Sequence, residues 1–358
     1  MAYQLPKKVR DLIPYDPISG SYQIRLDANE SPYAPDGQLL EELLKSSPAL
    51  NRYPDPYAAE CCALFARQFG LRQDQVVAGN GSDELISIIE GCLMEREMTL
   101  CTLQYDFSMY SFYSALAELR HVLIPKNADY SVDIDRVIGT VNREGADVLI
   151  FSNPCNPTSL LIGQDEIERL VASVGALVVL DEAYMDFAGN GRSGMDLIPK
   201  YDNLLILRTC SKAYGAAGLR MGFAAGNKTL IDAIKAAKSP YNVNAVTQAL
   251  CASLLREPDR IAQLSAALHA RAEMLCAGIE ALKERFPGRI GRVCGSSTNF
   301  AFFELTGAKE VHEALLRRSI AVRLMGDHLR ISAGTGEENG AVLAALEEIL
   351  QAKEAEGR

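Results

Sequence analysis

The sequence contains few of the residues that hold metal ions in proteins. Only four histidines occur among its 358 residues, and none of the nine cysteines forms a CxxC pair with another. This scarcity argues against a Cys/His metal site. An odd number of cysteines in a chain of this length also argues against a fold stapled by disulfides, so we expect free thiols in a reducing cytoplasm.

Long apolar runs, a basic excess and internal repeats are also lacking. No window approaches the ~18 apolar residues that a membrane-spanning helix needs, and the N-terminal MAYQLPKKVRDLIPYD has no apolar stretch of signal-peptide length. We therefore expect a soluble chain without a targeting segment. The net charge of −10 and the sequence pI of about 5.1 argue against a nucleic-acid partner.

What the chain does contain is a regular alternation of short apolar runs and helical patterns. The hydrophobic fraction of 48% allows a large core, and the length is typical of about two domains. Continuous apolar runs predict strands buried on both faces, in a mostly parallel sheet between helices. The predicted strands are 75–80, 99–104, 147–152, 176–181, 203–208 and 222–226, and the predicted helices among them include 39–47, 56–70, 83–93 and 109–119.

The pattern changes in the C-terminal third of the chain. Residues 229–285 are almost entirely helical in pattern, and shorter strands and helices follow them. This order is typical of a smaller α+β domain. We therefore expect an α/β protein with an N-terminal arm over 1–40 that contributes to the small domain, a large domain over 41–245 and a small domain over 246–358.

Polar clusters follow several apolar runs, at the strand ends where open parallel sheets bind ligands. The first, GNGSD over residues 79–83, could form an anion site from glycine turns and the N–H groups of a new helix. Taken alone, it is better explained as a plain helix cap made by Ser82 or Asp83. The second, NPCNPT over 153–158, could turn the Asn156 amide inward, although ordinary turn chemistry explains it equally well.

The third cluster is DEAY over residues 181–184. Asp181 ends an apolar strand, where burying a carboxylate costs free energy unless a cation or a strong donor meets it. A protonated pyridine nitrogen would meet it, and Tyr184 could reach the same ring from the side. The competing interpretation is an aspartate that caps a helix. Because Asp181 ends a buried strand, we favour the interpretation that it binds a ligand.

The fourth cluster contains Lys212, in a loop of small residues after a buried strand. Partial desolvation there favours the neutral, nucleophilic amine. Thr209, Ser211 and Arg220 supply hydroxyls and a guanidinium that could bind a phosphate. Most lysines are solvated surface residues, but a surface lysine does not usually lie among such potential phosphate-binding residues.

Together the four clusters contain the parts that pyridoxal 5'-phosphate requires: a phosphate cradle, a partner for the ring nitrogen, donors to a ring hydroxyl, and a lysine that can form a Schiff base. An aspartate that keeps the ring nitrogen protonated makes the ring an electron sink. The alternative from another class is a non-catalytic α/β protein that binds a dinucleotide through GNGSDE. No GxGxxG follows a first strand, and that alternative leaves Lys212 unexplained.

The same segments carry a resemblance to the aspartate-aminotransferase-like superfamily of pyridoxal-phosphate enzymes, and within it to the histidinol-phosphate aminotransferases. Matching motifs follow in the family's order over nearly the whole chain. They are LDANESPYAP (26–35), NRYPDP (51–56), GNGSDE (79–84), NPCNPT (153–158), DEAY (181–184), SKAYGAAGLRMG (211–222), PYNVN (240–244) and LRISAGT (329–335). The resemblance implies the fold of that superfamily and an aminotransferase.

The resemblance also implies roles for the residues that match the motifs. Lys212 would hold the cofactor as a Schiff base and move a proton, with Asp181 and Tyr184 as the other catalytic residues. The implied cofactor contacts are Asp181 at the ring nitrogen, Asn156 and Tyr184 at the ring hydroxyl, Phe107 stacked on the ring, and Ser82, Asp83, Thr209, Ser211 and Arg220 around the phosphate. Tyr53 would reach the phosphate from the neighbouring subunit, so a homodimer with shared active sites is implied.

Four further residues are implied at the substrate. Arg330 matches the arginine that grips the substrate's anionic end, and Tyr15, Asn29 and Arg323 stand at positions that contact the substrate in histidinol-phosphate enzymes. The implied reaction moves an amino group from histidinol phosphate to 2-oxoglutarate. An aromatic or broad-specificity aminotransferase and a threonine-phosphate decarboxylase share the motifs and stay as alternatives.

Three departures from the family's pattern bear on the substrate. Ser159 replaces the usual glycine after NPxNPT, QYD over 104–106 replaces PPT before the stacking aromatic, and the stretch LMGDHL between Arg323 and Arg330 is short. We expect none of them to touch the cofactor positions. The short stretch lies where a substrate side chain would be read.

Overall fold

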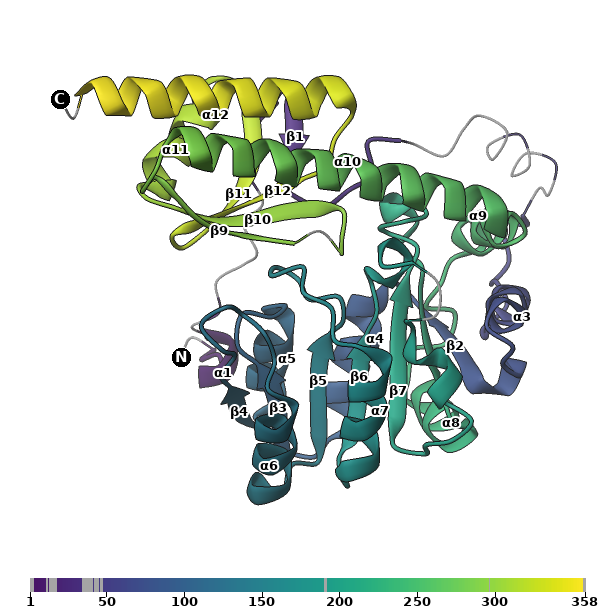
Figure 1. Ribbon diagram of the computed structural model, residues 1–358. Helices are drawn as coiled ribbons and strands as arrows, with labels where there is room; N and C mark the ends of the chain where they lie inside the picture. Colours follow the sequence, from purple (N-terminus) through teal and green to yellow (C-terminus); the bar gives the residue numbers. More distant parts are fainter. Residues whose placement is uncertain are drawn as a thin grey trace.

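The computed structural model describes residues 3–10, 12, 18–33, 41, 45, 48–189, 192–295 and 297–356. Two β-sheets covered by helices form the molecule, and the long helix α10 (Pro258–Arg285) contacts elements of both parts (Figure 1). Among the described helices, none combines the length and the apolar character needed to cross a membrane. The helix predicted over 39–47 falls mostly outside the described residues.

The large sheet has seven strands in the order β2-β8-β7-β6-β5-β3-β4. The strands from β7 to β4 are parallel to their neighbours, whereas β8 is antiparallel to both β7 and β2. The prediction of a mostly parallel sheet is therefore confirmed. The strands are β2 (Val76–Gly79), β3 (Thr99–Leu103), β4 (Arg120–Ile124), β5 (Val148–Ser152), β6 (Leu177–Asp181), β7 (Leu204–Thr209) and β8 (Gly222–Gly226).

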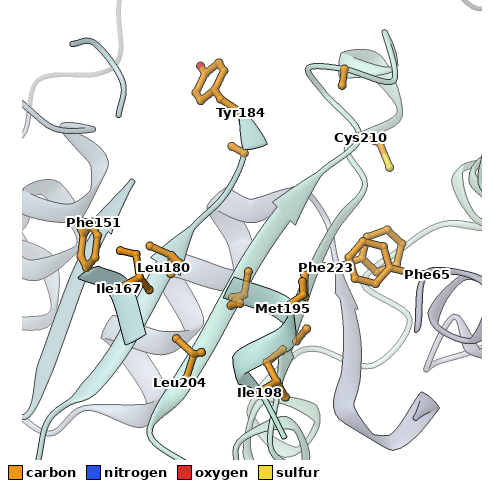
Figure 2. Packing of buried hydrophobic residues seen from close by; sticks show 14 of the residues in the cluster. Phe65, Phe151, Ile167, Leu180, Tyr184, Met195, Ile198, Leu204, Cys210 and Phe223 are labelled. Carbon is orange, nitrogen blue, oxygen red and sulfur yellow. The ribbon is translucent and has the colours of Figure 1, made fainter. Parts of the chain in front are cut away.

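The central strands carry apolar side chains on both faces, because helices cover the sheet on both sides. Every residue of β5 and β7 is buried. The buried apolar residues form three clusters among the described residues, and Figure 2 shows Leu180 and Leu204 in the largest of them. In the same cluster Phe65 stacks on Phe223 with ring centroids 4.3 Å apart. Burial of apolar surface at roughly 25 cal/mol per Å² is the main term that holds these strands in place.

Helices of the large sheet begin at polar caps in several places. The Asn227 and Asn244 side chains each accept a hydrogen bond, at 2.9 Å, from a backbone N–H in the first turn of α8 and α9, and Asp133 caps α6 in the same way. Such a cap contributes about 1 kcal/mol. The helices are α1 (Lys7–Arg10), α3 (Ala59–Gln68), α4 (Ser82–Ile88), α5 (Met109–Ala117), α6 (Ile134–Glu144), α7 (Gln164–Ser173), α8 (Lys228–Ala237) and α9 (Ala245–Leu255).

The small sheet has five strands in the order β1-β11-β12-β10-β9. Its edge strand β1 is parallel to β11, with Ile24 opposite Ile320, so an N-terminal segment completes a sheet that is otherwise C-terminal. Helices α11 (Ala308–Arg317) and α12 (Gly336–Glu356) pack on it beside α10. The strands are β1 (Ile24–Leu26), β9 (Ile290–Cys294), β10 (Phe300–Leu305), β11 (Ile320–Met325) and β12 (His328–Ser332).

The structure differs from the sequence pattern at the sheet edges and in the helical span. The pattern does not predict β1, β4 or β9, which are edge strands with partly exposed side chains and hence no continuous apolar run. The span predicted as helical over 229–285 is divided into α8, α9 and α10. Pro240 follows the end of α8, and Pro258 occupies the first turn of α10, where its missing N–H is tolerated.

A buried carboxyl group lies in the π-helical turn Ile89–Leu93 that continues α4. The Glu90 side chain is fully buried, and neither of its carboxyl oxygens has a hydrogen-bond partner among the described residues. Burial raises the pKa of Glu90 from its ordinary 4.5 to about 9. The folded protein therefore keeps this group protonated at neutral pH, whereas the unfolded chain ionises it.

Glu90 should make the folded protein less stable as the pH rises from about 4.5 to about 9, because only the folded state keeps the proton in that window. Glu90→Gln keeps the shape of the neutral side chain and removes the titration. We expect this variant nearly to match the wild type near pH ~4.5 and to raise the free energy of unfolding by at least roughly 2 kcal/mol near pH ~8. Urea unfolding at both pH values measures the difference.

The matched control is Glu95→Gln, which changes an exposed carboxylate shortly after the same segment. It should leave the pH dependence of unfolding as it is in the wild type. Parallel pH profiles for Glu90→Gln and the wild type would contradict the account of Glu90.

Candidate active site

One cavity gathers the polar clusters at the carboxyl ends of the strands. Because β5, β6 and β7 are parallel neighbours, their last residues meet at the same edge of the sheet. All the cofactor residues expected from the sequence line this cavity, except Tyr53. The lining residues are Ser82, Asp83, Phe107, Ser152, Asn156, Asp181, Ala183, Tyr184, Thr209, Ser211, Lys212 and Arg220.

Asp181 is the last residue of β6, and its side chain is only 4% exposed. One carboxyl oxygen, Oδ2, accepts a hydrogen bond from the Tyr110 hydroxyl at 2.9 Å, and Oδ1 accepts one from the Ala183 N–H at 3.0 Å. Burial raises the pKa of Asp181 to about 7, against the two hydrogen bonds, which lower it. No cationic side chain among the described residues lowers the pKa of Asp181, so a cation in the cavity would stabilise its ionised form.

Lys212 lies in the loop after β7 and lines the same cavity. Its Nζ donates to the carbonyl oxygen of Ala28 at 3.3 Å and lies 5.8 Å from the centre of the Tyr184 ring. The Tyr184 hydroxyl in turn accepts from Asn29 Nδ2 at 2.9 Å, and the Asn29 amide oxygen accepts from Ser332. Asn29, predicted as a substrate residue, therefore contacts Tyr184, whose ring lies near Lys212. Figure 2 shows Tyr184 beyond the end of its strand.

Hydroxyl groups and a guanidinium gather at one end of the cavity. Thr209 Oγ1 donates to Ser211 Oγ at 3.0 Å, and Arg220 Nη1 lies 3.4 Å from the same oxygen. Arg220 also forms an ion pair with Asp83 at 3.4 Å, next to Ser82 at the start of α4. This arrangement of donors is suited to an oxyanion such as a phosphate group.

Two glycines allow the backbone to come close at this end. A Cβ on Gly222 would lie 2.5 Å from the Gly81 carbonyl carbon and from the Ser82 nitrogen, and a Cβ on Gly81 would lie 2.6 Å from Arg220 Nη2. Gly81 also has a φ of 85°, which favours glycine. The glycines of the two motifs thus serve close packing around the donors.

The two arginines predicted at the substrate lie on neighbouring strands of the small sheet. Arg330 Nη1 donates to Asn156 Oδ1 at 2.8 Å, and its Nη2 donates to the Asp27 carbonyl oxygen at 2.9 Å. Arg323 of β11 stands directly opposite Arg330 in the strand register. The structure therefore brings Arg330 against the cavity residue Asn156 and places Arg323 beside it.

Tyr53 and Tyr15 are the predicted site residues that remain. Tyr53 is 81% exposed and stacks on Tyr241, with ring centroids 4.5 Å apart. It does not line the cavity of its own chain. Tyr15 lies outside the described residues.

The three departures from the family pattern have physical explanations. The short stretch before Arg330 is a tight hairpin through Gly326, whose φ is 59°. The Ser159 hydroxyl shares a hydrogen bond with the Thr298 hydroxyl at 2.9 Å. Asp106 accepts hydrogen bonds from the backbone N–H and the hydroxyl of Ser152. Ser152 lines the cavity, so Asp106 lies directly behind it.

Sequence reasoning assigned no role at the site to Tyr110, Ser152 or Asp106. Tyr110 looks like an ordinary core residue of an amphipathic helix, and only its spacing of one turn from Phe107 could have indicated a shared side. Ser152 is the last residue of β5, so its position at a strand end was the available signal.

The chain is similar in sequence to a known protein family and to curated relatives. Residues 21–346 match the family model "Aminotransferase class I and II". The chain is 34% identical over 352 residues to a histidinol-phosphate aminotransferase from Clostridium kluyveri, covering 96% of this chain and 98% of the relative.

Two solved structures share the fold. The histidinol-phosphate aminotransferase from Sinorhizobium meliloti in complex with pyridoxal-5'-phosphate has a TM-score of 0.86 at 21% identity over 98% and 99% of the two chains. The L-threonine-O-3-phosphate decarboxylase from Porphyromonas gingivalis has a TM-score of 0.79 at 23% identity over 92% and 99%.

Gly222→Ala should destabilise the protein by about 1–3 kcal/mol, because the added Cβ meets backbone atoms that cannot yield without moving Ser82. The matched control is Gly139→Ala in α6, where nothing lies within 4 Å of the added Cβ. That change should be neutral or stabilise by up to about 1 kcal/mol. Urea unfolding of both variants provides the comparison, and a similar effect at the two positions would refute the close-packing argument.

Proposed function

This chain belongs to the class I and II aminotransferase family, and we propose that it moves an amino group from histidinol phosphate to a 2-oxo acid such as 2-oxoglutarate. It is a pyridoxal-phosphate-dependent transaminase, which exchanges amino groups between amino and oxo compounds. One observation carries the proposal: Lys212 and Asp181, from neighbouring strand ends, line a single cavity that has phosphate donors at one end. When bound, the cofactor supplies an electron sink for the bonds at the substrate's reacting carbon.

The residues of the cavity fit this cofactor. The buried carboxylate of Asp181, without an ion pair among the described residues, matches a protonated ring nitrogen. Asn156 and Tyr184 would donate to the ring hydroxyl, and Phe107 would cover the face of the ring. The phosphate would be bound by Ser82, Asp83, Thr209, Ser211 and Arg220.

Lys212 has two tasks in the proposed mechanism. Its Nζ would hold the cofactor, and as a free amine it would take the proton from the substrate's α-carbon. The Tyr184 ring and the carbonyl oxygen of Ala28 both lie close to this amine and keep it at the cavity. Tyr184 therefore orients both the amine and the ring hydroxyl.

Arg323 and Arg330 support a phosphorylated substrate. Arg323 and Arg330 stand opposite each other across a strand pair, and two such guanidinium donors are well suited to binding a phosphate dianion. Arg330 also contacts Asn156, which connects the substrate's anionic end to the cofactor side of the cavity. Asn29 and Tyr15 would complete the substrate contacts.

A threonine-phosphate decarboxylase is the second candidate, because the same arginine pair fits any small phosphorylated amine and the fold is shared with such an enzyme. The spectral shift of the bound cofactor in single half-reactions separates the candidates. Histidinol phosphate, phenylalanine and threonine phosphate should be compared side by side. Release of CO2 from threonine phosphate would overturn the proposed transamination.

We also propose a homodimer in which Tyr53 reaches the phosphate donors of the neighbouring subunit. Its support is the exposure of Tyr53 and Tyr241, a stacked aromatic pair outside the cavity of their own chain. The reducing cytoplasm remains the proposed location, in keeping with nine free cysteines. The division into 1–40, 41–245 and 246–358 likewise stays a proposal.

Lys212→Ala should lower the rate of the histidinol-phosphate half-reaction by about 10²–10⁴-fold or more, because the variant lacks the group that moves the α-proton. The purified wild type should be yellow, and borohydride should fix the cofactor to a peptide that contains Lys212. Peptide mass spectrometry of the reduced protein checks the attachment. A variant without Lys212 that turns over at the wild-type rate would refute the assignment.

Arg323→Gln should raise the KM for histidinol phosphate by about 10–100-fold, because a charge-assisted hydrogen bond to the phosphate is lost. Histidinol, which lacks the phosphate, is the matched substrate, and its reaction should change little. Steady-state kinetics with both amines give the ratio. An equal loss for both substrates would show that Arg323 does not read the phosphate.

A further inference from the structure

A buried tyrosine lies directly behind the carboxylate of Asp181. Tyr110 belongs to α5 and is 1% exposed. Its hydroxyl donates to Asp181 Oδ2 at 2.9 Å. The other oxygen, Oδ1, accepts from the Ala183 N–H, so each carboxyl oxygen of Asp181 has one fixed donor.

The direction of the Tyr110 hydrogen bond follows from burial and charge. Burial and the nearby carboxylates raise the pKa of Tyr110 well above its ordinary value, so the hydroxyl keeps its proton and acts as the donor. A donor stabilises the ionised carboxylate and lowers the pKa of Asp181, whereas the negative charges of Asp106 and Asp83 raise it. Tyr110 therefore acts against the desolvation that favours the protonated form.

Tyr110 is also connected to the face of the cavity. Its ring meets Phe107 edge to face, with centroids 5.6 Å apart and planes at 84°. Phe107 lines the cavity, whereas Tyr110 does not. One segment thus supplies both the aromatic that would cover the cofactor ring and the hydroxyl behind its nitrogen partner.

We propose that Tyr110 is a positioning residue, which keeps the Asp181 carboxylate ionised and aimed at the ring nitrogen of the cofactor. This inference rests on the role proposed above for Asp181. Tyr110 touches neither substrate nor cofactor, and it acts only through Asp181. The Ala183 N–H belongs to the backbone and stays in place when a side chain is changed. The Tyr110 hydroxyl, in contrast, can be removed by a single substitution.

The test uses the holoenzyme and Tyr110→Phe, which removes the hydroxyl and keeps the ring against Phe107. Cofactor release from the diluted holoenzyme is followed by absorbance at a series of pH values. We expect the pH below which release accelerates to rise by about one unit, because the carboxylate without its donor is protonated at a higher pH. Above that pH, release should match the wild type.

Tyr113→Phe is the matched control, because it removes a hydroxyl from the same helix at a residue that does not contact Asp181. Its release profile should coincide with that of the wild type. A merely structural role of Tyr110 would speed release uniformly at all pH values, without moving the profile along the pH axis. A uniform change, or no change, would overturn the proposal.

Asp181→Asn separates this inference from the proposed function. On that background Tyr110→Phe should have no further effect on the pH profile, because the titrating carboxylate is absent. An Asp181→Asn holoenzyme that retains cofactor like the wild type would overturn the role of Asp181 itself. Impaired retention in Asp181→Asn beside an unchanged Tyr110→Phe would overturn the role of Tyr110 alone.

Discussion

The carboxylate of Asp181 is buried at the end of a strand whose neighbours are also buried, and an ionised carboxylate there costs free energy unless other groups stabilise it. Donors from Tyr110 and Ala183 offset part of that cost, yet the pKa still rises to about 7. A cationic ring in the cavity, as proposed for the cofactor, would supply the remainder. The free energy of cofactor binding and the protonation of Asp181 are therefore linked.

The topology of the large sheet determines what surrounds this carboxylate. Parallel strands deliver Ser152, Asp181 and Thr209 to one edge, because all three are the last residues of adjacent strands. The antiparallel strand β8 runs the opposite way and begins at this edge. Its first residue, Gly222, lies against the turn before α4, which brings Arg220 beside the start of that helix.

Most of the cavity was predictable, because each of its polar clusters follows an apolar run and strand ends of a parallel sheet converge. Tyr110 was not, since a buried hydroxyl within a helix resembles core packing until its partner is known in space. The edge strands β1, β4 and β9 carry partly exposed side chains, so their sequences lack the continuous apolar runs that predict buried strands. The domain boundary near residue 245 and the roles of individual site residues stay predictions.

The contacts of Arg330 connect the proposed substrate site to the cavity. Its guanidinium bonds Asn156 of the large sheet and the carbonyl oxygen of Asp27 next to β1, so one side chain of the small sheet joins three segments distant in the sequence. Arg323 belongs to the neighbouring strand β11 and stands directly opposite Arg330 in the register. With the role proposed for Arg323, a change there would alter which anion is bound, whereas a change at Arg330 would also disturb Asn156 at the cavity. Substrate specificity can diverge along the β11–β12 hairpin while the cofactor chemistry stays the same.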